Sequence, residues 1–179
     1  MPLTIGIDFG GVLSIHDGVS SDGIVSDRIV PPDDGDHTNT LINMPKALES
    51  LRELKRLGYK LVLISFCGRK RALETKASID QVIPGLFDEI FFTVNRDFKG
   101  DVCRKTGCDV MIDDRHDVLM SVRKTVPNIK LFWFGGDRDH GSMQAVKDWV
   151  SLTTWIKRLR REKIEPDPSV DLTRKVHVL

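Results

Sequence analysis

Short runs of β-branched and aromatic residues alternate with longer amphipathic stretches along most of the chain. The short runs are apolar throughout, which is typical of strands covered on both faces of a parallel sheet. They lie at residues 3–9, 60–65, 89–94, 109–112 and 129–134. The pattern therefore predicts five buried strands.

Helical spacing fills the intervals between these strands. Apolar residues three and four positions apart, from Met44 to Leu57, predict a helix that Asn43 caps and Gly58 ends. Further helices are expected at residues 70–82, 102–107 and 118–122, and a last one from about Ser142 onward. Strands that alternate with helices predict an α/β fold with a central parallel sheet, in a Rossmann-like three-layer sandwich.

Two segments lack any clear period. Residues 14–41 are rich in Asp, Gly, Ser and Pro and follow the first strand, where a flap over one end of the sheet would fit. Residues 165–179 contain two prolines and predict a C-terminal tail, whose residues 175–179 could add an edge strand. We expect one domain over residues 1–164, with the flap at 14–41 as its only insertion.

Composition narrows the classes of protein that fit. The 179 residues include 27 Lys and Arg and 26 Asp and Glu, a net charge of +1, which disfavours a strongly basic nucleic-acid module. No apolar run approaches the roughly 20 residues of a membrane helix. Three cysteines, an odd number, and an N-terminus without a secretory pattern lead us to expect a reducing, cytoplasmic setting.

Polar residues follow the predicted strands at the ends where parallel sheets bind ligands. Asp8 follows the first strand, Ser65 ends the second, and the pair Asp113 and Asp114 follows the fourth. Lys99 comes soon after the third. Clustered carboxylates need a cation and suit Mg²⁺, whereas a lysine and a hydroxyl beside them suit a phosphoryl group.

The order of these residues resembles the four motifs of the haloacid dehalogenase superfamily. The stretch ALESLRELKRLGYKLVLIS, which ends at Ser65, is similar to that family's approach to its second motif, and the likeness covers roughly residues 3–135. The sequence DVMIDDRHDVL resembles small-cap members, among them phosphatase domains of enzymes that process polynucleotide ends. The flap is too short for the larger helical cap of the branches that cleave C–Cl or C–P bonds.

The resemblance implies a role for each matching residue. Asp8 would attack phosphorus and form an aspartyl-phosphate, Ser65 would hydrogen-bond the phosphate, and Lys99 would offset negative charge. Lys105 competes with Lys99 for that role. Mg²⁺ would be held by Asp8, Gly10, Asp113 and Asp114. Substrate contacts are expected from Gly10, Gly11, Ser65, Cys67, Gly68 and Arg69.

One position departs from the family's pattern. Phosphatases of the superfamily carry a second aspartate two residues after the nucleophile, as general acid and base, and Gly10 stands there in this chain. General acid–base catalysis contributes roughly 10²–10⁴ in rate, or about 3–5 kcal/mol. A backbone carbonyl remains at Gly10 for the metal.

Three interpretations remain open. The chain could be an atypical phosphohydrolase for substrates whose leaving group needs no acid, or it could bind phosphate and metal without efficient turnover. Alternatively, the proton could come from the flap, which carries His16, Asp17, Asp34 and His37. A small flap leaves the site open to a bulky or macromolecular phosphorylated substrate, a nucleic acid being one alternative. Cys67 is interpreted as a small residue that fills space, not as a nucleophile.

Overall fold

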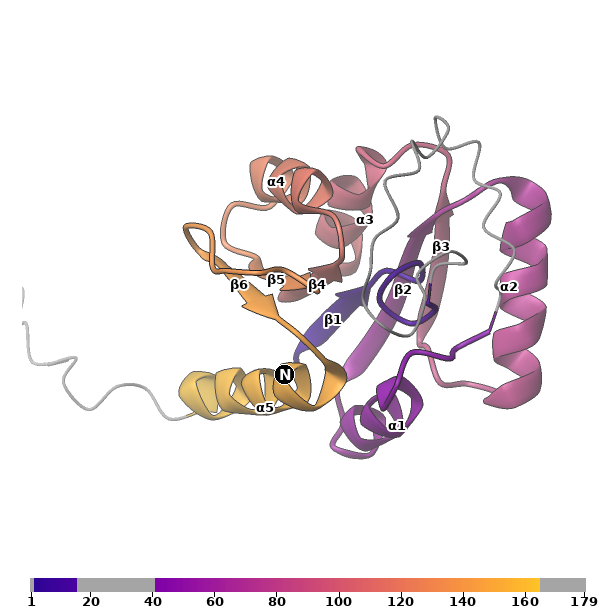
Figure 1. Ribbon diagram of the computed structural model, residues 1–179, viewed down its shortest axis with the longest axis horizontal. Coiled ribbons are helices and arrows are strands. Elements are labelled where there is room, and N and C mark those ends of the chain that lie inside the picture. Colours follow the sequence, from indigo (N-terminus) through magenta and orange to yellow (C-terminus); the bar gives the residue numbers. More distant parts are fainter. Residues whose placement is uncertain (1, 16–40, 165–179) are drawn as a thin grey trace, which may run out of the picture.

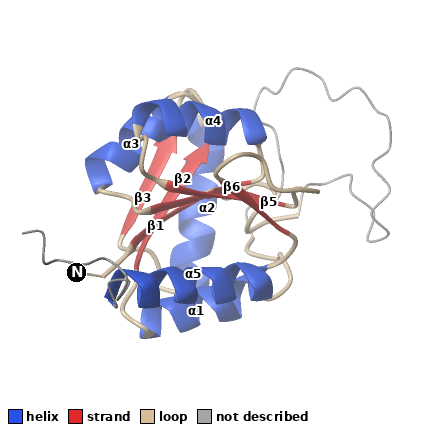
Figure 2. Cartoon of the chain, turned by 90° about the vertical axis from the view of Figure 1, so that its left-hand side faces the viewer, coloured by secondary structure: helices blue, strands red, loops and turns tan. Residues whose placement is uncertain are grey.

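The computed structural model describes residues 2–15 and 41–164, and within them a parallel sheet lies between two layers of helices (Figures 1 and 2). The strands are β1 (Thr4–Ile7), β2 (Lys60–Phe66), β3 (Glu89–Thr93), β4 (Val110–Asp113), β5 (Lys130–Phe134) and β6 (Met143–Val146). The helices are α1 (Ala47–Arg56), α2 (Arg69–Val82), α3 (Phe98–Thr106), α4 (His116–Thr125) and α5 (Trp149–Ile164). The predicted α/β class with a central parallel sheet is confirmed.

The order of the strands creates one point of reversal in the sheet. The strands run β3-β2-β1-β4-β5-β6, so the chain adds strands on one side of β1 and then crosses to the other. Ile7 of β1 pairs with Leu63 of β2 and with Ile112 of β4. Ligands of open parallel sheets bind at the carboxyl ends of the strands beside such a reversal, which here is the junction of β1 and β4.

Helices cover both faces of the sheet. Figure 2 shows α3 and α4 on one face and α1 and α5 on the other. Alternate residues of β1, among them Ile5 and Ile7, join the core beneath α1 and α5, with Leu51 and Leu54 of α1. The second core lies under α3 and α4, and its buried members are Val62, Ile64, Cys103, Cys108, Met111, Val118, Leu119, Val122, Ile129, Leu131 and Met143. Burial on both faces explains why the strands read as continuous apolar runs.

The last part of the described chain differs from the sequence prediction. A helix was expected from about Ser142, but residues 143–146 form β6, which pairs with β5 in parallel. The helix α5 begins only at Trp149. The apolar residues Met143, Val146 and Trp149 are spaced by three, so a four-residue strand and the helix after it share one apparent helical period.

The first helix also begins later than predicted. Asn43 does not cap it; its side-chain oxygen instead accepts a hydrogen bond from the backbone N–H of Ile15 at 2.8 Å. The residue that precedes α1 is Lys46, at a φ of 64° and without a side-chain cap. Pro45 accounts for the delay, because the residue before a proline disfavours helical conformation.

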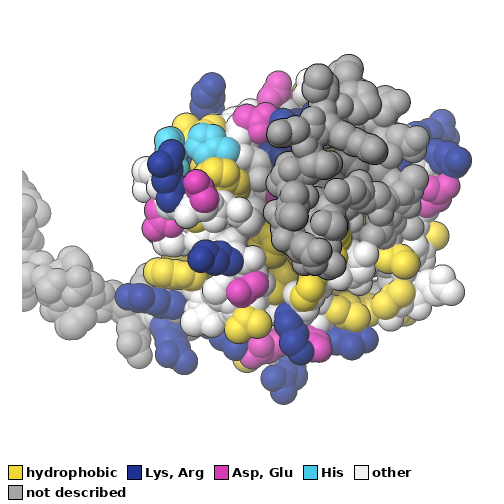
Figure 3. Space-filling model, viewed as in Figure 1, with side chains coloured by type: hydrophobic (Ala, Val, Ile, Leu, Met, Phe, Trp, Pro, Cys, Tyr) yellow, Lys and Arg dark blue, Asp and Glu magenta, His cyan; other side chains and the backbone are white. Residues whose placement is uncertain are grey.

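The visible surface of the molecule carries charges of both signs (Figure 3). Figure 3 shows cationic and anionic side chains interspersed on the visible face, without a large area of one sign. Among residues 2–15 and 41–164 there is no helix with the length and apolarity needed to cross a bilayer. Most of the expected flap, residues 16–40, and the expected tail, 165–179, lie outside the described residues, as does the possible edge strand at 175–179.

Candidate active site

Asp8 and Asp113 meet where the strand order reverses. Asp8 follows β1 directly, and its backbone N–H donates to the carbonyl of Ile112 in β4 at 3.0 Å. Asp113 is the last residue of β4. The residues Asp8 and Asp113 are 7% and 0% exposed, so the sheet carries two carboxyl groups into a nearly dry environment. Burial of ionised carboxylates is costly unless a counter-charge accompanies them.

Lys99 supplies that counter-charge. Its Nζ lies 3.0 Å from Asp8 Oδ1 and 2.7 Å from Asp113 Oδ2, and the side chain is 2% exposed. Burial lowers the pKa of Lys99, but Asp8 and Asp113 raise it by more, so the pKa is above its ordinary value. The amine therefore stays protonated between the two carboxylates. Lys99 lies in the first turn of α3, which begins four residues earlier than the helix predicted at 102–107.

The competing lysine lies elsewhere. Lys105 is near the carboxyl end of α3, with Nζ 5.6 Å from the centre of the Phe91 ring. It is exposed, whereas Lys99 is buried among the carboxylates. Of the two lysines considered from the sequence, the structure brings only Lys99 to the acidic residues.

The acidic residues form a cluster that could hold a metal ion. One carboxylate oxygen from each of Asp8, Asp113 and Asp114 lies within 4.8 Å of the others. These are hard oxygen donors of the kind that Mg²⁺ and Ca²⁺ prefer. A divalent cation at this place would offset the mutual repulsion of the carboxylates, together with the ammonium of Lys99. The donor set therefore fits a metal ion, as the sequence led us to expect, and a particular metal is not distinguished.

The surroundings of Asp113 raise the pKa of its carboxyl group. Burial raises the pKa of Asp113, Lys99 lowers it, and Asp8 and Asp114 raise it further, with the net pKa above its ordinary value. Asp113 Oδ1 also accepts a hydrogen bond from the backbone N–H of Arg115 at 2.9 Å. This bond fixes the orientation of the carboxyl group at the end of β4.

A tight turn follows Asp8. Leu13 N–H and Ser14 N–H both donate to the carbonyl of Phe9, at 2.9 Å and 3.0 Å. Gly11 has a φ of 71°, which favours glycine, whereas Gly10 is outside the positive-φ region. The backbone conformation at Gly10 is therefore one that other residues can adopt, and the φ of the turn does not require glycine there.

The residues expected to contact substrate lie around the end of β2. Ser65 is buried, and the register that pairs Ile7 with Leu63 places it level with the residue after Asp8. Burial raises the pKa of the Cys67 thiol, Arg71 lowers it, and the nearby Asp8 raises it. A raised thiol pKa opposes a nucleophilic role. Gly68 precedes α2, and Arg69 is its exposed first residue. Contact of any of these residues with a substrate remains a prediction.

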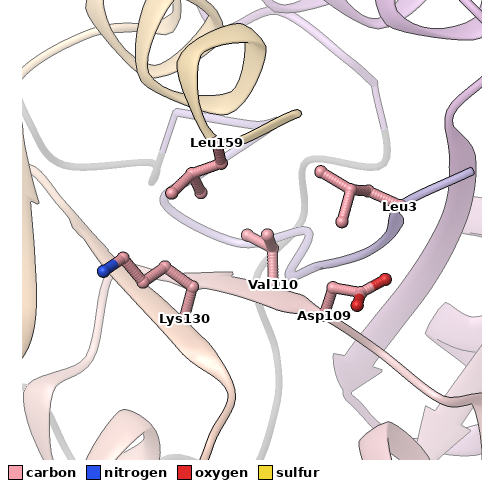
Figure 4. A pocket seen from close by; sticks show the side chains of 5 residues that line it. All are labelled: Leu3, Asp109, Val110, Lys130 and Leu159. Atoms are coloured by element: carbon pink, nitrogen blue, oxygen red, sulfur yellow. The ribbon is translucent and has the colours of Figure 1, made fainter. Parts of the chain in front are cut away.

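The remaining candidates from the sequence, and a small cavity, lie outside the acidic cluster or outside the described residues. The flap residues His16, Asp17, Asp34 and His37, considered as proton sources, lie outside the described residues. A small cavity lies at the opposite, amino end of the strands (Figure 4). It is lined by Leu3, Asp109, Val110, Lys130 and Leu159. Asp109 already accepts a hydrogen bond from Thr4 N–H at 2.9 Å, and the cavity is separate from the acidic cluster.

Sequence reasoning did not identify Trp133 as part of this region. The indole N–H of Trp133 donates to the backbone carbonyl of Asp114 at 3.0 Å. Trp133 belongs to β5, and its apolar neighbours led to its interpretation as one more residue of a buried strand. The only sequence signal is the pair Gly135 and Gly136 directly after the strand, which permits close approach of backbone to a large ring.

Comparison with solved structures finds the same fold in other proteins. An uncharacterized protein from Listeria monocytogenes serotype 4b has a TM-score of 0.59 at 15% identity, over 89% of this chain and 99% of that one. A haloacid dehalogenase-like family hydrolase from Xanthomonas campestris has a TM-score of 0.57 at 12% identity, over 92% and 99%. A HAD-superfamily hydrolase from Ehrlichia chaffeensis has 0.51 at 15%, over 65% and 58%. No protein-family model and no curated protein matches the sequence significantly. At these identities, the likeness establishes the haloacid dehalogenase-like fold.

Proposed function

We propose that this chain, whose fold is haloacid dehalogenase-like, is a Mg²⁺-dependent phosphohydrolase that acts through an aspartyl-phosphate on Asp8. The observation that carries the proposal is the buried contact of Lys99 with both Asp8 and Asp113, beside a cluster of three carboxylates. A carboxylate held next to a fixed ammonium and a metal site is suited to receive a phosphoryl group.

The reaction requires two displacements at phosphorus. In the first, an oxygen of Asp8 bonds to phosphorus, the ester P–O bond breaks, and the leaving oxygen takes the electron pair. In the second, water attacks phosphorus, the bond to Asp8 breaks, and inorganic phosphate and the free carboxylate are formed. Lys99 stabilises negative charge at Asp8 in both steps, and Ser65 would donate a hydrogen bond to a phosphate oxygen.

The metal would be held by the carboxylates of Asp8, Asp113 and Asp114 and by the carbonyl of Gly10. When bound, Mg²⁺ would neutralise charge and orient the phosphoryl group. The support for a metal at this place is the donor set, in which one carboxylate oxygen from each of Asp8, Asp113 and Asp114 lies within 4.8 Å of the others. Asp113 would lose its proton as the metal binds, because metal ligation requires the carboxylate.

Gly10 has no acidic side chain that could protonate the leaving group. The leaving oxygen must therefore depart as an anion or take its proton from water, which favours substrates with acidic leaving groups. The same absence slows the second displacement, because no carboxylate at this position activates the water. We propose an enzyme that hydrolyses activated aryl phosphates much faster than alkyl phosphates.

A second function is favoured by the same glycine. Without a general acid and base, the site could bind phosphate and a metal with little turnover, as a regulatory or binding domain. The two functions share the metal site and differ in whether Asp8 reacts. Measurement of hydrolysis distinguishes the two functions, since a domain that only binds the ester releases neither inorganic phosphate nor the alcohol or phenol.

Steady-state hydrolysis tests the choice. The native chain, Asp8→Asn and Gly10→Asp are assayed with Mg²⁺ on an aryl and an alkyl phosphate. We expect aryl phosphate hydrolysis by the native chain and its loss in Asp8→Asn, with a gain of about 10²-fold or more on the alkyl ester in Gly10→Asp. No native activity, with activity in Gly10→Asp, supports the binding domain. Activity that survives Asp8→Asn would contradict both functions.

A further inference from the structure

The side chain of Trp133 joins the end of β5 to the acidic cluster. Its indole N–H donates to the backbone carbonyl of Asp114 at 3.0 Å. The pairing of β4 with β5 ends at Asp113 and Trp133. The hydrogen bond from the indole links the two segments one residue further, at Asp114, which belongs to the acidic cluster.

The indole is itself enclosed. A Cβ at Gly136 would lie 2.6 Å from Trp133 Cδ2 and 2.8 Å from Cε3, so only glycine permits this approach of the backbone to the ring. The ring of His116 meets the indole edge-on, with centroids 5.2 Å apart, and His140 meets His116 in the same way at 4.6 Å. Figure 3 shows the two described histidines grouped at the upper left of the face. The contacts with Gly136 and His116 leave the indole little freedom to turn.

The position of Asp114 depends on this enclosed ring. Asp113 has its own restraints, because Lys99 contacts one of its oxygens and the N–H of Arg115 contacts the other. Asp114 follows the end of β4 and is only half-buried, so the strand pairing no longer fixes its backbone. The bond from Trp133 provides a restraint at that point.

We propose that Trp133 is a positioning residue for the metal site, and that it holds the backbone of Asp114 so that its carboxylate faces Asp8 and Asp113. The inference rests on the proposed function, since it takes Asp114 as a metal ligand. Groups that hydrogen-bond metal-ligating residues affect affinity because an ordered site loses less entropy when the metal binds, and their removal typically costs 10–100-fold in affinity.

Titration calorimetry with Mg²⁺ alone tests the inference. Trp133→Phe keeps an aromatic ring between Gly136 and His116 and removes the N–H donor. We expect its dissociation constant for Mg²⁺ to rise about 10-fold or more. Trp155→Phe is the matched control, because Trp155 lies on α5, where Arg158 stacks on it at 5.4 Å, across the sheet from α4. Its affinity should equal that of the native chain.

Gly136→Ala provides a second variant that keeps the donor and displaces the ring. Its dissociation constant for Mg²⁺ should rise, as that of Trp133→Phe does. A merely structural role would lower the melting temperature of both variants without metal and leave their Mg²⁺ affinities native, which would overturn the inference. A native chain that binds no Mg²⁺ would instead overturn the proposed metal-dependent function itself, and the positioning role with it.

Discussion

Lys99 carries a positive charge at a position where both the helix dipole and burial disfavour a cation. It lies in the first turn of α3, where the helix dipole repels cations, and its side chain is almost fully buried. Its contacts with Asp8 and Asp113 offset both costs. Because these contacts compensate for an otherwise unfavourable position, we propose that Lys99 acts together with the two carboxylates.

Replacement of Lys99 by methionine should therefore affect stability and activity together. Lys99→Met leaves two carboxyl groups buried without their ammonium, and the expected loss is about 3–5 kcal/mol in the free energy of unfolding at neutral pH. The loss should shrink as the pH falls, because protonated carboxyls need no counter-charge. Urea unfolding with and without Mg²⁺ measures it, and the metal should stabilise the variant more than the native chain.

Lys105→Met is the control for this experiment. Lys105 is exposed and contacts only the face of Phe91 among the interactions described above. Its replacement should change the free energy of unfolding by about 0.5 kcal/mol or less. If Lys105→Met lost as much stability and activity as Lys99→Met, the assignment of the motif lysine would be wrong.

The two glycines after Asp8 should respond differently to a side chain. Gly11 has a φ of 71°, so Gly11→Ala should destabilise the chain by about 1 kcal/mol, because an L-residue is strained there. Gly10 is not in this region, and Gly10→Ala should leave the melting temperature near the native value. Differential scanning calorimetry of the two variants compares them. A strong loss in Gly10→Ala would show that Gly10 is needed for the turn.

Asp88 connects three elements near the amino ends of β2 and β3. Its Oδ2 accepts a hydrogen bond from Leu61 N–H at 2.8 Å, and its Oδ1 accepts one from Lys55 Nζ at 2.6 Å. Burial raises the pKa of Asp88, but the bonds from Lys55 and Leu61 outweigh it, so the pKa lies below its ordinary value. A single carboxylate thus joins the end of α1 to β2 and to the start of β3.

Asp88→Ala should lower the free energy of unfolding by about 1 kcal/mol at neutral pH. A carboxyl whose pKa is lowered on folding contributes stability above its unfolded pKa of about 4, and that contribution is lost as the pH falls through the folded pKa. The difference in the free energy of unfolding between Asp88→Ala and the native chain should therefore become smaller at acidic pH. Urea titrations at several pH values measure it, with Asp80→Ala, an exposed partner of Lys76 on α2, as control. A difference that is constant with pH would exclude the ionic contribution.

Sequence patterns predicted five of the six described strands and missed the last one, β6. The strands from β1 to β5 were found because each is a short apolar run, and the helix α2 was found because Pro84 and Gly85 mark its end. The four-residue β6 was missed, because its apolar residues continue the period of α5. Periodicity alone does not divide two elements whose apolar positions are in phase.

The candidate site was predictable in part for a similar reason. Asp8 and Asp113 directly follow or end buried strands, so topology alone brings them together. Lys99 reaches them only because α3 begins earlier than its apolar pattern indicates, with Phe98 half-exposed in its first turn. The bond from Trp133 to Asp114 depends on the direction of a ring, which no spacing in the sequence specifies.

The first residue of α5 contacts the turn that follows Asp8. The indole N–H of Trp149, the first residue of α5, donates to the carbonyl of Val12 at 2.8 Å, and Trp149 is fully buried. α5 also contacts α1 through Lys157 and Glu53. The helix α5 therefore supports the turn that follows Asp8, although the two segments are far apart in the sequence.

Trp149→Phe should reveal this long-range support. Phenylalanine fills part of the space but leaves the Val12 carbonyl without its donor, and the expected loss is about 1–3 kcal/mol in the free energy of unfolding. Activity should fall as well, because the turn that carries Asp8 loses one of its restraints. Chemical denaturation and steady-state kinetics measure both effects. Trp155→Phe, at a half-buried position of the same helix, should lose less in each, and equal losses would contradict the specific role of Trp149.

If Asp8 is the nucleophile of a metal-dependent phosphoryl transfer, the phosphoryl group should be detectable on Asp8 itself. Native chain and Asp8→Asn are mixed with an aryl phosphate and Mg²⁺, quenched in acid and analysed by mass spectrometry of their peptides. Because Gly10 offers no base for the second displacement, the phosphoryl group should accumulate on Asp8 in the native chain and be absent from Asp8→Asn. A native chain that hydrolyses the ester without any phosphoryl-Asp8, at a rate that Asp8→Asn shares, would contradict the account.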